Sequence, residues 1–346
     1  MPGKISVGDG RTALGRFVPE RAFIEEEALE HPTGRAIAEK LATLGVAPRV
    51  LRHGQRPEIP GTGPAELYRG SKNTLVVRVW RRSEFAPCKP SADYQLPLVS
   101  SCPHMCEYCY LQTRLGSRPY IRVYANVEEI LRRAAEIAME SSPAVVSFEG
   151  AATSDPLAVE HISGSLGRSI EFFGALENAH FRFVTKSADV GPILGASHNG
   201  KTRVRFSVNT PSVIRTYEHK TARLEERLEA LLRVRQDGYP VGIMIGPVIL
   251  TDGWEREYEG LLRAVGDVLG NMPSPTSRDL EQSSLPVEVI THRFTERAKR
   301  NILSVFPSTE LPMSEGERRF VRGQFGYGKY VYREAEIQAV RRFFEV

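Results

Sequence analysis

From about residue 95 onward, short apolar runs alternate with longer segments in which apolar residues recur at helical spacing. The apolar runs predict strands at residues 95–99, 144–148, 181–185, 204–208, 241–249 and 287–291. The segments between them predict helices at residues 127–140, 157–176, 188–196, 222–237 and 254–269. Such alternation indicates parallel βα units, arranged as a barrel, a partial barrel or an open doubly wound sheet. In a barrel, the functional site lies at the carboxyl ends of the strands.

The flanking segments follow different patterns. Residues 1–65 mix short helical patterns with Gly and Pro turns, and residues 74–80 predict a strand. Residues 271–284 are rich in Ser and Pro, which predicts a surface loop. Residues 323–333 alternate aromatic and basic side chains around glycines, which predicts a hairpin.

Composition and charge narrow the class of protein. The 41% hydrophobic and 25% charged residues of this 346-residue chain are ordinary for a soluble globular protein. The net charge is +4, and residues 292–346 alone hold eleven Lys or Arg against seven Asp or Glu. The longest uncharged apolar run, residues 241–250, has about half the ~20 residues of a membrane helix. The N-terminus shows no signal peptide, so we expect a cytoplasmic protein without membrane association.

Three of the four cysteines, Cys102, Cys106 and Cys109, fall within eight residues directly after a predicted strand. Three thiolates on one loop can hold three irons of a cubane and leave the fourth iron open, since no fourth cysteine is near. The alternatives are a zinc site completed by His104, or plain buried cysteines. Zinc sites more often use paired Cys-x2-Cys spacing, and His104 lies inside the loop between two ligands. The pattern favours a [4Fe–4S] cluster.

The CxxxCxxC triplet, with Tyr108 just before its third cysteine, resembles the signature of the radical S-adenosylmethionine superfamily. The resemblance implies that S-adenosylmethionine chelates the open iron. One electron, from a donor such as flavodoxin or ferredoxin, then cleaves the cofactor to a 5′-deoxyadenosyl radical. The protein must orient this radical and exclude water from it.

Further strings resemble one family within this superfamily, the spore photoproduct lyases. They are CEYCYLQT at 106–113, LGSRPYIRVY at 115–124, KPSA at 89–92, FVTK at 183–186, HNGKTR at 198–203, RFS at 205–207, HRFT at 292–295 and GKYVYR at 328–333. Each string alone is weak. Their common order and similar spacing from about residue 20 to residue 335 indicate membership.

The resemblance implies an α/β fold with a partial (βα)6 TIM-like barrel. We expect an N-terminal α/β extension at residues 1–85, the barrel at residues 86–295, and a basic, aromatic hairpin with a helix at residues 296–346. The family repairs 5-thyminyl-5,6-dihydrothymine in ultraviolet-damaged spore DNA. The radical abstracts hydrogen from C6 of the lesion, the methylene bridge breaks, and a cysteine returns a hydrogen atom. The lesion must leave the base stack to reach the cluster.

The resemblance also assigns residues. S-adenosylmethionine contacts are implied for Tyr110, Ser154, Lys186, Ser207 and Asn209. Such contacts are chemically sensible, because an ammonium group can pair with the cofactor's carboxylate and small polar side chains can hold its amine and ribose. Tyr108 is implied to lie near both cofactor and lesion, and the protein is expected to act as a monomer on damaged duplex DNA.

Two departures from the family pattern matter. Where the family reads Ala-Cys-Thr-Ser-Asp, this chain has Ala152 in place of the hydrogen-donating cysteine. The remaining cysteine, Cys88, precedes a matched segment that the family places near the lesion, so Cys88 is a candidate hydrogen donor. Tyr108 and Tyr110 are the alternative candidate donors. In the hairpin, Gln324 and Phe325 replace an Arg-Tyr pair. Phe325 can still stack in a gap left by a base, and the flanking cations Arg322 and Lys329 can meet phosphates.

These departures leave three functions open. The leading hypothesis is a radical carbon–carbon lyase that repairs a thymine-derived DNA lesion. The second is a radical enzyme of the same family that acts on another nucleic acid, a nucleotide or a peptide. The third is an inactive protein that binds distorted DNA. The retained cysteines, Lys186 and Ser154 argue against the third, because a binding protein needs no cofactor contacts.

Overall fold

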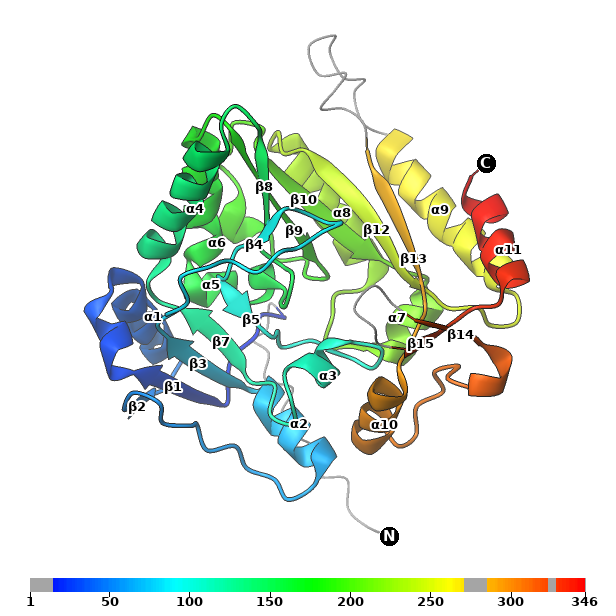
Figure 1. Cartoon of the computed structure of the whole chain (residues 1–346), viewed down its shortest axis with the longest axis horizontal. Helices are drawn as coiled ribbons and strands as arrows, with labels where there is room; N and C mark the ends of the chain where they lie inside the picture. Colours follow the sequence, from blue (N-terminus) through cyan, green and yellow to red (C-terminus); the bar gives the residue numbers. More distant parts are fainter. Residues whose placement is uncertain (1–14, 271–284, 323–327, 346) are drawn as a thin grey trace.

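The computed structural model describes residues 15–270, 285–322 and 328–345. At its centre, six parallel strands pair in the order β13–β12–β10–β9–β8–β4. The strands are β4 (Tyr94–Gln95), β8 (Val146–Glu149), β9 (Ala179–Thr185), β10 (Thr202–Val208), β12 (Val241–Val248) and β13 (Val287–Thr291). The sheet curves into a half-barrel, with helices along its outer face (Figure 1). The predicted α/β partial barrel is confirmed.

Side-chain alternation along the strands separates a helix-facing side from an inner side. Phe181 and Phe183 of β9 are fully buried, and Phe181 stacks on Phe173 of the outer helix α6, with ring centroids 5.1 Å apart. Because successive strand residues point to opposite faces, Arg182 points away from the face that Phe181 and Phe183 form. The outer helices are α4 (Val127–Ser141), α6 (Ser165–Ala175), α8 (Leu224–Gln236) and α9 (Trp254–Gly270).

A second sheet adjoins the half-barrel, in the order β2–β1–β3–β7–β5. Its strands are β1 (Arg21–Glu25), β2 (Arg49–Leu51), β3 (Thr74–Arg78), β5 (Val99–Ser100) and β7 (Ile121–Tyr124), and it is accompanied by η1 (Glu26–Glu30), α1 (Pro32–Thr43) and α2 (Pro64–Lys72). β5 and β7 lie on either side of the cysteine loop in sequence. The N-terminal segment therefore shares a sheet with the segment that carries the cysteines, and the three-part division of the chain stays a proposal.

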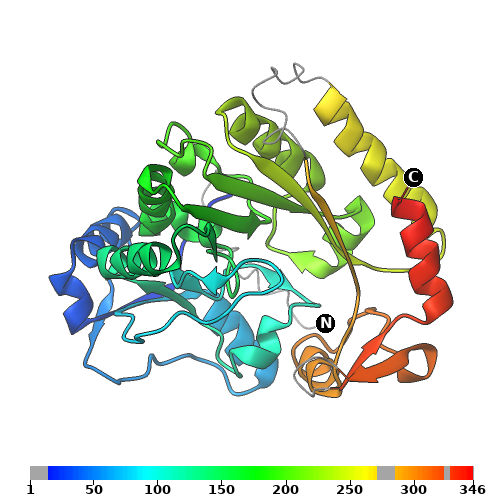
Figure 2. The same cartoon turned by 45° about the horizontal axis from the view of Figure 1, so that its top comes forward.

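The C-terminal segment closes on the cysteine loop. Helix α10 (Glu296–Val305) packs against α2 and against α3 (Leu111–Arg114), the short helix that follows the third cysteine. Figure 2 shows this segment beside the open edge of the half-barrel. It continues through η4 (Glu315–Glu317), β14 (Arg319–Arg322), β15 (Gly328–Val331) and α11 (Glu334–Phe344). No helix in the described ranges is long and apolar enough to cross a membrane.

Three predicted elements differ in the structure. The run at 95–99 divides into β4 and β5, which join different sheets because Pro97 lies between them. The helix at 157–176 is divided into η2 (Pro156–Val159), α5 (Glu160–Ser163) and α6, with Gly164 left-handed at φ 61°. The predicted helix at 188–196 is wrong: only η3 (Gly191–Ile193) forms, because Pro192 and the left-handed Gly195 interrupt it.

Candidate active site

The three cysteines predicted to hold the cluster lie on one loop between β5 and α3. Cys102 and Cys106 are buried and Cys109 is half-buried. Within the loop, β6 (Met105–Cys106) pairs with β11 (Glu218–His219), so that Cys106 lies opposite Glu218. Each thiol lies within electrostatic reach of the other two. The loop thus places the three thiols in one neighbourhood, with Cys106 opposite Glu218.

The electrostatics of this loop suit a bound cationic centre. Burial raises the pKa of Cys102 to about 11 and raises the pKa of Cys106 further. The thiolate is the form that ligates iron, so these groups need a positive centre against which to lose their protons. Close by, the hydroxyl of Ser154 is buried and has no hydrogen-bond partner in the described part of the chain. Three neighbouring thiols and an unpartnered hydroxyl fit a cluster with a bound cofactor in chemical type.

His104 does not join the cysteines as a fourth ligand. Its Nδ1 lies 3.5 Å from an Asp155 carboxylate oxygen, and its Nε2 lies 3.5 Å from the Ser187 hydroxyl. Asp155 also accepts hydrogen bonds from Thr185 and from the backbone N–H of Lys186. Burial raises the pKa of Asp155 to about 6 despite these bonds. His104 therefore belongs to a carboxylate network that holds the β9 exit, which speaks against the zinc alternative.

Lys186 lies at the centre of the polar groups above the cysteine loop. Its ammonium nitrogen is 2.9 Å from the Ser207 hydroxyl, 3.0 Å from the Tyr108 hydroxyl and 2.8 Å from a Glu218 carboxylate oxygen. The Tyr108 hydroxyl also donates to Glu218. Three residues assigned by resemblance therefore meet, and the carboxylate that joins them was not predicted.

Glu218 and Arg227 form a buried ion pair beneath this network. Arg227 on α8 donates to Glu218 across 2.6 Å and to the Ser207 carbonyl across 2.8 Å, and both side chains are fully buried. Burial alone would raise the pKa of Glu218, but Lys186 and Arg227 outweigh it and hold this pKa at about 2. The sequence could have indicated that Arg227 is buried, because it falls on the apolar stripe of α8 together with Leu224, Leu228 and Leu231.

Asn209 follows β10 and is fully buried. Its amide nitrogen donates to the Pro247 carbonyl across 2.8 Å, and its amide oxygen accepts from the Thr210 backbone N–H and the Tyr258 hydroxyl. These bonds fix the exits of β10 and β12. The cofactor contact assigned to Asn209 stays a prediction.

Tyr110, Ala152 and Cys88 lie together at the mouth of the half-barrel. The Tyr110 side chain is 54% exposed, and its hydroxyl donates to the Ala152 carbonyl. Cys88 is half-buried and lies within electrostatic reach of both Tyr110 and Glu149. The Cys88 thiol thus lies near Ala152, the position at which the family has its hydrogen-donating cysteine.

The turn that carries Cys88 is fixed by residues that sequence reasoning missed. Ser91 donates to Glu149 across 3.0 Å, and Glu149 is ion-paired with Arg205. Arg205 also lies 2.9 Å from Glu288 on β13. Both Glu149 and Arg205 are 2% exposed. This pair ties the turn to the inner face of β8 and β10.

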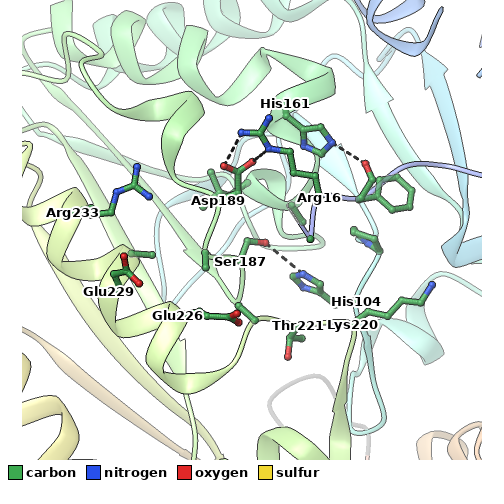
Figure 3. Close-up of a pocket in the computed structure, with 18 residues that line it drawn as sticks. Arg16, His104, His161, Ser187, Asp189, Lys220, Thr221, Glu226, Glu229 and Arg233 are labelled. Atoms are coloured by element: carbon green, nitrogen blue, oxygen red, sulfur yellow. Dashed lines mark hydrogen bonds and ion pairs between the residues drawn. The ribbon is translucent and has the colours of Figure 1, made fainter. Parts of the chain in front are cut away.

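A cavity of about 330 Å³ borders the cysteine loop at Pro103 and His104. Figure 3 shows His104 and Ser187 facing each other there, with the Arg16–Asp189 ion pair above them in the view. Acidic and basic side chains are mixed around it. None of the residues assigned to cofactor or DNA lines this cavity.

The predicted DNA contacts fall on the C-terminal hairpin and lie away from the cysteine loop in sequence. Arg322 is exposed at the end of β14, and Lys329 is half-buried on β15 opposite Val321. Gln324 and Phe325 lie outside the described residues. Phe320, also on β14, is 54% exposed and packs edge-on against Tyr330. The hairpin presents cationic and aromatic side chains.

The buried carboxylate gives a testable dependence on pH. A carboxyl whose pKa is lowered on folding stabilises the protein above its unfolded pKa, and this stabilisation is lost as pH falls toward 2. In the cluster-free protein, Glu218→Gln should lower the free energy of unfolding at pH 7 by about 3 kcal/mol, because it breaks a buried ion pair. Measured by urea unfolding, the free energy of unfolding of this variant should also fall less steeply between pH 7 and pH 3 than that of the wild type.

The matched control is Glu225→Gln, at an exposed position on α8, the helix that carries Arg227. This variant should leave both the free energy of unfolding at pH 7 and its dependence on pH unchanged. Equal unfolding free energies for Glu218→Gln and the wild type at pH 7 would contradict the role given to this carboxylate.

Comparison with known proteins agrees with this geometry. The family model described as spore photoproduct lyase matches residues 17–346. The spore photoproduct lyase of Clostridium acetobutylicum is 45% identical over 324 residues, which cover 94% of this chain and 93% of the relative. The spore photoproduct lyase of Bacillus subtilis is 41% identical over 330 residues, with 95% and 94% covered.

Solved structures are equally similar. A spore photoproduct lyase complexed with dinucleoside spore photoproduct is 41% identical with a TM-score of 0.89, and 95% of each chain is covered. A variant with one cysteine-to-alanine and one serine-to-cysteine change, with bound AdoMet and dinucleoside spore photoproduct, is 42% identical with a TM-score of 0.89 and the same coverage. The similarity spans the cysteine loop, the half-barrel and the C-terminal segment. The chain belongs to the spore photoproduct lyase family.

Proposed function

We propose that this chain is a radical S-adenosylmethionine enzyme that repairs spore photoproduct in DNA and that uses a hydrogen donor other than the family's cysteine. The observation that carries the proposal is the proximity of three thiols, two of them buried, to Lys186 and the unpartnered Ser154 hydroxyl at the carboxyl ends of the half-barrel strands. A relative of the same fold binds AdoMet and dinucleoside spore photoproduct together.

The cluster and its cofactor, when bound, supply reductive cleavage of a sulfonium and a carbon radical that removes hydrogen from C6 of the lesion. Cys102, Cys106 and Cys109 would hold the cluster. The Lys186 ammonium would pair with the cofactor carboxylate, and the Ser154 hydroxyl would gain the partner it lacks in the protein. Glu218 orients Lys186, because the two groups form an ion pair across 2.8 Å in a buried setting.

The direct test is anaerobic turnover of a dinucleotide spore photoproduct with S-adenosylmethionine and dithionite. Repair to thymidylyl-thymidine, identified by mass, is the expected product. Formation of 5′-deoxyadenosine without repair would instead support a different substrate for the same chemistry. Absence of 5′-deoxyadenosine from protein that holds its cluster would support an inactive DNA-binding protein.

Iron content tests the ligand set. Anaerobically reconstituted protein should bind close to four irons, and Cys102→Ala, Cys106→Ala or Cys109→Ala should each abolish this, because three thiolates are the fewest that leave a single iron open. Cys88→Ala is the matched control and should bind the same iron as the wild type. Loss of iron in Cys88→Ala would refute the three-cysteine assignment.

Cys88 is the hydrogen donor that we favour in place of the thiol absent at Ala152. Burial raises the pKa of the Cys88 thiol, and the nearby Glu149 carboxylate raises it further, so the group keeps its S–H hydrogen. Transfer would break this S–H bond, form a C–H bond on the thymine radical and leave the unpaired electron on sulfur. Tyr108 and Tyr110 are the alternative donors.

The solved variant with two substitutions supports this assignment. In that relative one cysteine is replaced by alanine and a serine earlier in the chain is replaced by cysteine. Its two changed positions are separated by the same number of residues as Cys88 and Ala152 here. The present chain thus has, by spacing, the arrangement of cysteine and alanine that was introduced into the relative.

Product analysis tests the donor. Cys88→Ala should divert turnover from clean repair to radical adducts, and the double variant Cys88→Ala with Ala152→Cys should restore thymidylyl-thymidine. A Cys88→Ala product distribution identical to that of the wild type would show that a tyrosine or an external reductant ends the radical. Cys88→Ser preserves the size of the side chain and should behave as Cys88→Ala does.

We also propose that the C-terminal hairpin binds damaged duplex DNA. The plot of log binding constant against log salt concentration should be less steep, by about one, in Arg322→Ala and in Lys329→Ala. Each variant loses about one phosphate contact and the counterion that this contact releases. Phe325→Ala should weaken binding of damaged or unpaired DNA by about 1–3 kcal/mol through lost stacking, with a smaller loss on intact duplex. Fluorescence anisotropy at several salt concentrations measures both.

The control for these variants is Lys40→Ala, an exposed cation on α1. It should leave the salt slope unchanged. Equal losses of affinity on damaged and intact DNA for Phe325→Ala would show that this ring packs within the protein.

A further inference from the structure

Two buried polar side chains of α2, Tyr68 and Lys72, lie one helical turn apart beneath the cysteine loop. Their exposed fractions are 3% and 2%, and both come from the N-terminal segment, outside the half-barrel. Residues at i and i+4 share one face of a helix, so α2 presents both groups to the same neighbour. No sequence motif pointed to them.

Lys72 is a buried cation whose contacts are all neutral. Its ammonium donates to the Cys102 carbonyl across 2.9 Å and to the Ser101 hydroxyl across 3.2 Å, and it lies 5.4 Å from the centre of the Tyr68 ring. In the described part of the chain, no carboxylate lies within ion-pair distance of it. A charge this deeply buried is costly unless an opposite charge compensates it.

Tyr68, in turn, lacks a hydrogen-bond acceptor in the described ranges. Its hydroxyl is buried and has no hydrogen-bond partner among the described residues. Phe306 of the C-terminal segment packs edge-on against the ring, with centroids 5.7 Å apart, and so limits its movement. Burial raises the pKa of Tyr68, and the three cysteine thiols raise it further, which places the phenol within electrostatic reach of all three. A donor without an acceptor therefore faces the cysteine loop.

Resting on the proposed function, we propose that Lys72 and Tyr68 compensate the negative charge of the cluster and favour its reduced state. Three thiolates on a cubane carry net negative charge, and reduction adds one more electron to it. The Lys72 ammonium, bonded to the Cys102 carbonyl, would supply counter-charge, and the Tyr68 hydroxyl would supply a free donor beside the three thiols. Net charge and hydrogen bonds to sulfur set the potentials of such clusters. The N-terminal segment thereby tunes the electron that starts the reaction.

The test is a redox titration of the reconstituted cluster, followed by electron paramagnetic resonance, in the wild type, Lys72→Met and Tyr68→Phe. Lys72→Met should bind the same iron but show at least a tenfold smaller equilibrium constant for reduction, a midpoint lower by about 59 mV for one electron. Tyr68→Phe should shift the midpoint in the same direction by a smaller amount. Lys72→Arg keeps the charge and should stay closer to the wild type.

Lys40→Met, which removes an exposed lysine on α1, is the matched control and should leave the midpoint unchanged. Thermal unfolding of the cluster-free proteins adds an independent readout: Lys72→Met should be at least as stable as the wild type, because the cation is uncompensated there. Variants that hold four irons with the wild-type midpoint would overturn this inference and leave the proposed function standing. Failure of the wild type itself to bind iron would overturn the proposed function.

Discussion

The site depends on one buried carboxylate, Glu218. Its backbone pairs with Cys106 in the short β6–β11 ladder, while its side chain holds Lys186, Tyr108 and Arg227. A single residue therefore fixes the register of the cysteine loop and the position of the cation that would meet the cofactor. The ion pair is stable in the interior because two cations share the carboxylate and the Tyr108 hydroxyl also donates to it.

The half-barrel supplies the frame on which this carboxylate acts. Parallel strands bring their carboxyl ends to one edge, so residues far apart in sequence, such as Ser154, Lys186 and Ser207, lie together there. The second sheet adds β5 and β7 on either side of the cysteine loop, and α10 packs against α2 and α3 from the other side. The loop is thus fixed by three parts of the chain rather than by local structure alone.

The amino-acid pattern predicted the features that are local in sequence. Cysteine spacing identified the loop that brings three thiols near one another, and apolar periodicity located most barrel strands and the helix around Leu228 and Leu231. The helix predicted at 188–196 does not form. Its apolar spacing suggested a helix, but Pro192 and the left-handed Gly195 interrupt the helical backbone.

Glu218, Lys72 and Tyr68 were missed for a different physical reason. Their roles arise from contacts with residues remote in sequence, and no local pattern distinguishes a buried glutamate or lysine from one on the surface. Arg227 is an exception, because a charge on the apolar stripe of an amphipathic helix already indicates a buried ion pair. The identities of Lys186 and Ser207 as site residues came from family resemblance, and the structure shows that their side chains meet.

The central claim is that this site removes a hydrogen atom from C6 of the thymine lesion. The most direct measurement is turnover of a dinucleotide spore photoproduct deuterated at C6, with mass analysis of the 5′-deoxyadenosine formed. The account predicts that deuterium appears in 5′-deoxyadenosine while thymidylyl-thymidine accumulates. Repair accompanied by 5′-deoxyadenosine that carries no deuterium would contradict it.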